Sequence, residues 1–127
     1  MKTNIFEKIS NDETLTGLQM RILASLYCHS DKYNEIIISK WYYHEMTLKF
    51  KTSIRAVKES ILSLRKKNYM TKIKNNHYMF NPFLISDCSK DSKRFAIMNK
   101  KWDDYMSILI NMKKNKTIDI HEAIGMN

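Results

Sequence analysis

Residues 52–80 have the pattern of a helix that leads directly into a β-hairpin. The apolar side chains of the helix recur at spacings of three, four and three residues, which is typical of a helix with one buried face. Thr52 can cap this helix, and Asn68 tolerates the left-handed conformation that ends it. Asn75-Asn76 separates the two strands and suits the positive φ of a type I′ turn. The apolar positions are Ile54, Val57, Ile61 and Leu64, and the strands are residues 69–74 and 77–80.

Two helices and one short strand are predicted before this unit. Thr16 and Gln19 have the spacing of a capping box, and apolar residues continue from there at helical spacing. A β-branched run predicts the strand, and Ser39 can cap the helix after it. The predicted elements are a helix over about 17–29, a strand over 35–38, and a helix over about 40–48 with Trp41 or Tyr42 and Met46 facing inward.

The C-terminal third predicts one long helix. It can be capped by Ser89, Asp91 or Ser92, and it ends near Lys114. We expect it to pack against the first helix and to offer surface to a partner chain. Residues 118–120 suggest a short ordered return. The apolar side of the long helix holds Phe95, Met98, Trp102, Tyr105, Met106, Leu109 and Met112.

The order of these elements is that of a winged helix-turn-helix. The predicted fold class is therefore mainly α with a small β-hairpin, and it includes a long C-terminal helix. Residues 1–14 should form a mobile arm or one helical turn. The winged helix-turn-helix should span residues 15–82, and residues 83–127 should form the C-terminal helix and a tail, a region that is a candidate for dimerisation.

Positive charge is concentrated in one segment of the chain. The net charge is +9, and residues 49–74 carry nine basic side chains against Glu59 alone. This segment covers the third helix and the hairpin. A solvated charged face, or a winged domain that binds protein, is the alternative interpretation. The coincidence of charge with these two elements favours binding to double-stranded DNA, because a helix fits the major groove and a cationic hairpin can reach phosphates.

Two kinds of contact are expected from this segment. Arg55 could recognise guanine through a bidentate hydrogen-bonded contact, and Glu59 could accept a hydrogen bond from cytosine. The lysines would neutralise phosphates. His77, at the base of the hairpin, is a further expected contact. The predicted DNA-binding residues are Lys51, Thr52, Ser53, Arg55, Lys58, Glu59, Lys72, Lys74, Asn75 and Asn76.

Catalytic and cofactor motifs are absent from the sequence. Two glycines cannot form a phosphate-binding loop, and the four histidines never take metal-binding spacings. Cys28 and Cys88 are isolated and predict free thiols. We expect no enzyme activity, no cofactor and no metal. The N-terminal residues lack a secretory pattern, and no apolar run is long enough for a membrane span, so we expect a cytoplasmic protein.

The run from Thr52 to Met70, followed by Tyr78-Met79-Phe80-Asn81-Pro82 and later Trp102, resembles the RepL-type replication proteins of Firmicute plasmids. In that family a hairpin that ends in Asn-Pro follows the recognition helix. The chain departs from winged helices in general by having Asn68 where glycine is usual. The resemblance covers about residues 15–105 and implies binding to the origin or control region of a plasmid or mobile element.

The expected function is thus sequence-specific binding of double-stranded DNA that initiates or controls such replication. A transcriptional regulator of the same fold is one alternative. A protein-interaction or single-strand-binding module, among replication proteins, is another. DNA readers are often two-fold symmetric. We therefore expect a homodimer joined through Tyr105, Leu109 and Met112, and a monomer with this helix folded back on the core is the alternative.

Overall fold

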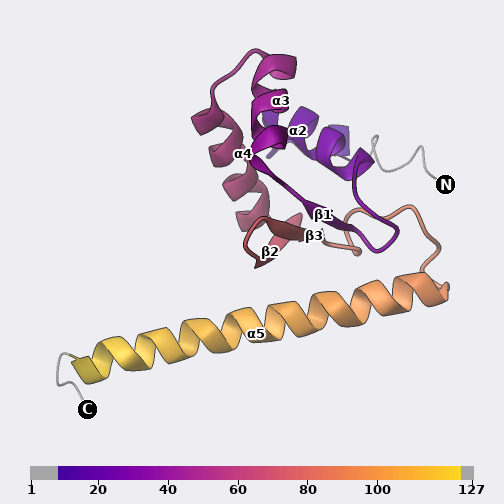
Figure 1. Ribbon diagram of the computed structural model, residues 1–127. Helices are drawn as coiled ribbons and strands as arrows, with labels where there is room; N and C mark the ends of the chain where they lie inside the picture. Colours follow the sequence, from indigo (N-terminus) through magenta and orange to yellow (C-terminus); the bar gives the residue numbers. More distant parts are fainter. Residues whose placement is uncertain (1–8, 124–127) are drawn as a thin grey trace.

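The computed structural model describes the backbone of residues 9–123 and the side chains of residues 9–114. Three helices lie on one side of a small antiparallel sheet with strand order β1-β3-β2, and the long helix α5 runs along the other side (Figure 1). The mainly helical fold with a small sheet and a long C-terminal helix is confirmed. The elements are α2 (Gly17–Cys28), β1 (Glu35–Ile37), α3 (Lys40–Phe50), α4 (Ile54–Lys66), β2 (Met70–Lys74), β3 (His77–Phe80) and α5 (Lys93–Ala123).

Strand β3 separates two apolar clusters. Tyr78 and Phe80 face helices α2 to α4, whereas Met79, between them, packs with Phe95 and Trp102 of α5. The ring of Phe80 is fully buried and meets the ring of Tyr27 edge-on, with centroids 5.5 Å apart. Neighbouring side chains of a strand point to opposite faces, so three successive buried residues require cover on both faces of the sheet.

Helix α5 differs from the prediction in its packing and its length. Its buried residues contact the sheet and not the first helix, because Met79 and Ile73 offer apolar surface there. Ser92 begins the helix, since its Oγ accepts a hydrogen bond from the N–H of Phe95 at 3.1 Å. The helix continues to Ala123. The predicted end near residue 114 and the return at 118–120 are therefore wrong, because no proline or glycine interrupts residues 93–123.

Residues 9–14 are not an arm in this structure, and residues 9–10 are helical, in line with the alternative of one helical turn. Ile9 is buried in the main cluster, and the carboxylate of Asp12 accepts a hydrogen bond from the hydroxyl of Tyr69 at 2.5 Å. Hydrogen bonds to Asp12 from the side chain of Thr14 and from Tyr69 lower its pKa below the usual range. Residues 1–8 of the predicted arm lie outside the described residues. The segment after them packs on the domain.

The hairpin turn is not of type I′. Asn76 has a φ of 62°, but Asn75 does not have a positive φ. Lys74 pairs with His77 while Lys72 pairs with Tyr78, so Ile73 is an extra residue that forms a bulge in β2. A bulge of this kind lets a turn with one left-handed residue close the hairpin.

The α3–α4 connection also differs in detail. Helix α3 continues to Phe50, and Lys51 follows in the left-handed conformation with a φ of 51°. Ser53, and not Thr52, caps α4, because its side chain accepts a hydrogen bond from the N–H of Ala56. Ile54 is 48% exposed and so leaves the predicted buried stripe, because it is the first residue of α4, at the connection to α3.

Mutation can test which of the two residues, Thr52 or Ser53, caps the N-terminus of α4. We expect Ser53→Ala to lower the free energy of unfolding by about 1 kcal/mol, because the N–H of Ala56 would lose its partner. Thr52→Ala should change it by only a few tenths of a kcal/mol. Urea denaturation of the two variants compares them. Equal losses would contradict the assigned cap.

Candidate nucleic-acid interface

The outer face of α4 carries an exposed ion pair. Nε of Arg55 lies 3.0 Å from Oε1 of Glu59, and both side chains are more than half exposed. The opposite face of the helix is held in the core by Val57, Ile61 and Leu64. Exposed pairs four residues apart contribute only about 0.3–0.5 kcal/mol. The helix thus directs Arg55 outward, and its guanidinium can exchange Glu59 for another acceptor at little cost.

Three cations lie over aromatic rings of α3, on the side where α2 and α3 pack against α4. Nζ of Lys58 lies 5.6 Å from the centroid of the Tyr43 ring. Lys49 and Arg21 lie over the ring of Phe50, at 5.5 and 5.8 Å. Burial and a hydrogen bond with Tyr78 raise the pKa of Tyr43 to about 12. Cation–π contacts of this kind restrain the cations while leaving their charge exposed.

Sequence reasoning did not place Arg21 in this group. It lies on α2, outside the basic segment, and reaches Phe50 at the end of α3 because α2 and α3 both pack against α4. No local signal in the sequence indicates this approach.

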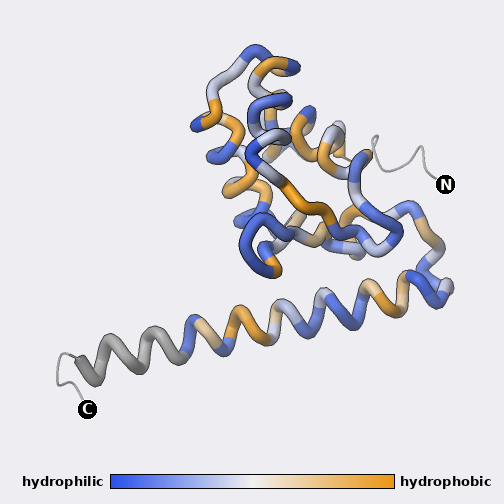
Figure 2. Tube along the Cα trace, in the orientation of Figure 1, coloured by the Kyte–Doolittle hydropathy of each residue, from blue (hydrophilic) through white to orange (hydrophobic). Residues whose placement is uncertain are grey.

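The hairpin presents a second group of polar side chains. Lys72, Lys74, Asn75 and Asn76 are all exposed, and the turn is hydrophilic in Figure 2. The carbonyl of Asn76 accepts a hydrogen bond from the N–H of Ile38 at 2.7 Å, which fixes the turn to the end of β1. The hairpin is therefore anchored to β1 through β3, whereas β2, which carries the two lysines, is an edge strand of the sheet.

His77 does not join the hairpin contacts, in contrast to the prediction. Its Nε2 lies 3.1 Å from Oε1 of Glu35, and Oε2 of the same carboxylate accepts a hydrogen bond from Lys101 at 2.9 Å. Because Glu35 is largely buried, this network turns the imidazole toward α5. The contact ties the base of the hairpin to the long helix.

The structure places the predicted residues in two groups. Lys51, Thr52, Ser53, Arg55, Lys58 and Glu59 lie at the α3–α4 connection and along the first half of α4. The hairpin residues form the other group. The side chain of Ser53 is occupied as a cap, and Thr52 is half-buried.

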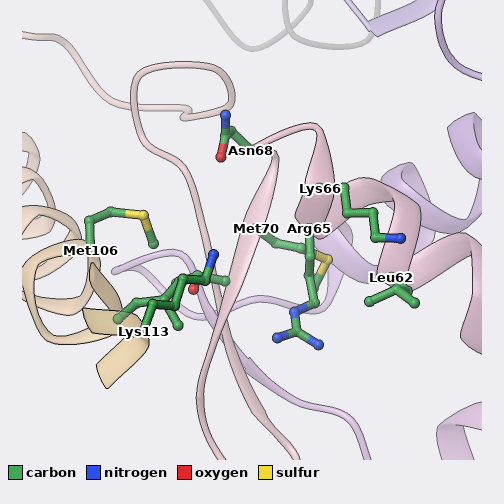
Figure 3. A pocket seen from close by; sticks show the side chains of 9 residues that line it. Leu62, Arg65, Lys66, Asn68, Met70, Met106 and Lys113 are labelled. Atoms are coloured by element: carbon green, nitrogen blue, oxygen red, sulfur yellow. The ribbon is translucent and has the colours of Figure 1, made fainter. Parts of the chain in front are cut away.

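A groove of about 340 Å³ lies between the second half of α4, β2 and α5. Figure 3 shows Arg65, Lys66 and Leu62 on the α4 side, with Met106 and Lys113 on the α5 side. The groove is open and mixes cations with apolar side chains. Its lining residues are Leu62, Arg65, Lys66, Asn68, Met70, Thr71, Met106, Leu109 and Lys113.

Thiols and titratable groups elsewhere do not assemble into a metal site. Within the described residues, no three His, Cys, Asp or Glu side chains are placed so that they could hold a metal ion. Cys28 and Cys88 are free thiols. Among the same residues, no helix has the length and apolar character needed to cross a membrane.

Comparison with known proteins gives no match: no family model, no curated protein and no solved structure is similar to this chain.

Proposed function

We propose that this chain binds double-stranded DNA, with α4 in the major groove and the β2–β3 hairpin on neighbouring phosphates. The observation that carries the proposal is the placement of charge. The segment 49–74, with nine basic side chains and one acidic side chain, covers the end of α3, the α3–α4 connection, α4 and strand β2, and seven of its nine cations are exposed. Such an arrangement suits a helix that reads base edges and a hairpin that neutralises backbone charge.

The roles within the site follow from geometry. Arg55, on the outer face of α4, has the planar donor group that pairs with guanine. Lys58, Lys72 and Lys74 are point charges suited to phosphates. Arg21 and Lys49, held over Phe50, extend the cationic surface beside the start of α4. In this proposal affinity comes mainly from the lysines, and sequence preference from the few side chains of α4.

We expect duplex binding to depend strongly on salt. If Lys51, Lys58, Lys72 and Lys74 each neutralise one phosphate, the slope of log K against log salt should be about −3.6. Affinity should then fall about 100-fold between roughly 50 and 200 mM salt. Fluorescence anisotropy with a labelled duplex measures this. Absence of duplex binding at low salt would overturn the proposal and favour a protein-interaction module.

The biological target within this proposal follows the resemblance to RepL-type proteins. We propose the origin or control region of a plasmid or mobile element, and a transcriptional operator is the second candidate. Footprinting on DNA that flanks the coding sequence separates them. Protection of repeats at an origin supports replication control, whereas protection of a promoter supports transcriptional regulation.

A further inference from the structure

The groove between α4, β2 and α5 is lined by cations and, among the described residues, by no acidic side chain. Arg65 and Lys66 line its α4 side, and none of the ion pairs within the described part of the chain includes either of them. Lys113 adds a cation on the α5 side (Figure 3). The position of Arg65 and Lys66 in the last turn of α4 suits the helix dipole but gives them no acidic partner. The groove is therefore complementary to a negatively charged ligand.

Apolar side chains form the rest of the groove. Leu62 on α4 is 45% exposed, and Met106 and Leu109 on α5 are half-buried. Met70 of β2 lies between the two helices (Figure 3). An apolar centre with a charged rim is the usual anatomy of a protein interface, whereas phosphates are bound by cations and hydrogen-bond donors. The combination favours a protein segment over a nucleic acid as the ligand of this groove.

Strand β2 borders the groove with a free edge. Among the described strands, β2 pairs with β3 only. Because α4 and α5 lie on opposite faces of the sheet, a groove between them beside β2 opens at this edge.

Backbone hydrogen-bonding groups of β2 point to the free edge. The N–H of Phe80 donates to the carbonyl of Asn34, on the β1 side of β3, at 2.8 Å. Hydrogen-bonding groups alternate in direction along a strand, so those of Tyr78 also face β1, and those of Lys72, opposite Tyr78, face away from β3. Lys72 is exposed and directly follows Thr71, which lines the groove. An extended segment beside β2 could therefore pair with the backbone of Lys72.

We propose that this groove binds an extended acidic segment of a partner protein. The segment lies along the free edge of β2, where its backbone pairs with that of Lys72. An apolar side chain enters between Leu62 and Leu109, and carboxylates reach Arg65 and Lys66. Strand addition of this kind takes its affinity from main-chain hydrogen bonds and its specificity from side-chain pockets. The inference does not rest on DNA binding, because the groove lies beside the second half of α4.

The groove gives a position to one residue that the sequence assigned to a dimer interface. Leu109 lines the groove, and Tyr105 packs against the cluster that contains Trp102. Met112 is 62% exposed on α5. Two of the three expected interface residues thus lie against their own domain, and a dimer through these side chains stays a prediction.

Fluorescence anisotropy tests the groove on the whole chain, with a labelled synthetic peptide of central valines and flanking glutamates as the probe. The wild-type chain should bind it at low salt. Leu62→Glu and Lys66→Glu should each weaken binding at least about tenfold, because each places a carboxylate in the groove. Leu48→Glu and Lys40→Glu are the matched controls, because both residues are exposed on α3, and they should keep the wild-type affinity. Far-UV circular dichroism checks that the variants are folded. Failure of the wild-type chain to bind would overturn the proposal.

Changes to the probe separate the contributions of charge and apolar contact. Lysines in place of the glutamates should abolish binding, and serines in place of the valines should weaken it at least about tenfold. Equal affinity for the serine peptide would leave only charge attraction and would overturn the proposal. The same result would follow if Leu62→Glu weakened binding to duplex DNA as much as binding to the peptide, because the groove would then belong to a nucleic-acid surface.

Amide hydrogen exchange measured by NMR tests the pairing with β2 independently. Saturating peptide should slow the exchange of the Lys72 N–H at least about tenfold, because this donor gains a carbonyl partner. The N–H of Thr71 is the internal control, because it faces β3 and should change little. Unchanged exchange at Lys72 in the presence of bound peptide would overturn the extended pairing.

Discussion

Trp102→Ala should lower the free energy of unfolding by about 3–5 kcal/mol, because removing a buried tryptophan leaves a cavity and loses its apolar contacts. Trp102 is 5% exposed and packs in a small cluster with Met79, Phe95 and Met98. This cluster is the main apolar attachment of α5 to the sheet. This loss would be a large fraction of the free energy of unfolding, which is typically about 5–15 kcal/mol for a domain.

The second tryptophan of the chain provides the control. Trp41 is 62% exposed on α3 and meets the ring of Tyr42 edge-on at 5.2 Å. Trp41→Ala should therefore change the stability by less than about 1 kcal/mol. Urea denaturation followed by far-UV circular dichroism measures both variants. Similar losses for the two would contradict the packing of α5 on the sheet.

Sequence patterns predicted the helices and strands well where each has its own local signal. The capping box of Thr16 and Gln19 is present with both hydrogen bonds, and the apolar spacing of α4 marks its buried face from Val57 onward. Asn68 has the left-handed φ expected after α4. Such features depend on residues within one or two turns of each other, so the sequence contains them directly.

The position of α5 depended on contacts that the helix pattern does not contain. An apolar face indicates that a helix packs against another part of the protein, but it does not indicate which element that is. The run Tyr78, Met79 and Phe80 held the missing signal, because three successive apolar residues in a strand indicate a sheet buried on both faces. This run in β3 therefore predicts a second layer of structure on the other face of the sheet, where α5 lies.

The details of the candidate site were less predictable for a similar reason. Thr52 and Ser53 are both good caps, so the local sequence does not distinguish them, and in the structure Ser53 caps α4 after Lys51 ends α3 in the left-handed conformation. His77 follows a turn in the sequence, yet its partner Glu35 is more than forty residues away. Contacts between distant segments determined which polar side chains remain exposed.

Base reading and phosphate neutralisation should be separable by mutation. Arg55→Ala should weaken binding to the preferred sequence by about 1–3 kcal/mol and leave binding to random DNA nearly unchanged, because a bidentate contact to guanine is lost. Lys72→Ala and Lys74→Ala should weaken both kinds of DNA alike. Each should also reduce the salt slope by about one unit, because one phosphate contact is removed.

Glu59→Gln is the matched control for Arg55. It removes the ion pair of α4 without removing the guanidinium, and the pair itself contributes little to stability because both side chains are exposed. If Arg55 reads a base, Glu59→Gln retains preference at the position that Arg55 contacts, whereas Arg55→Ala loses it. Equal weakening of preferred and random DNA by Arg55→Ala, together with a lower salt slope, would instead assign Arg55 to phosphate. Sequence preference would then have to come from other side chains of α4 or from the shape of the DNA.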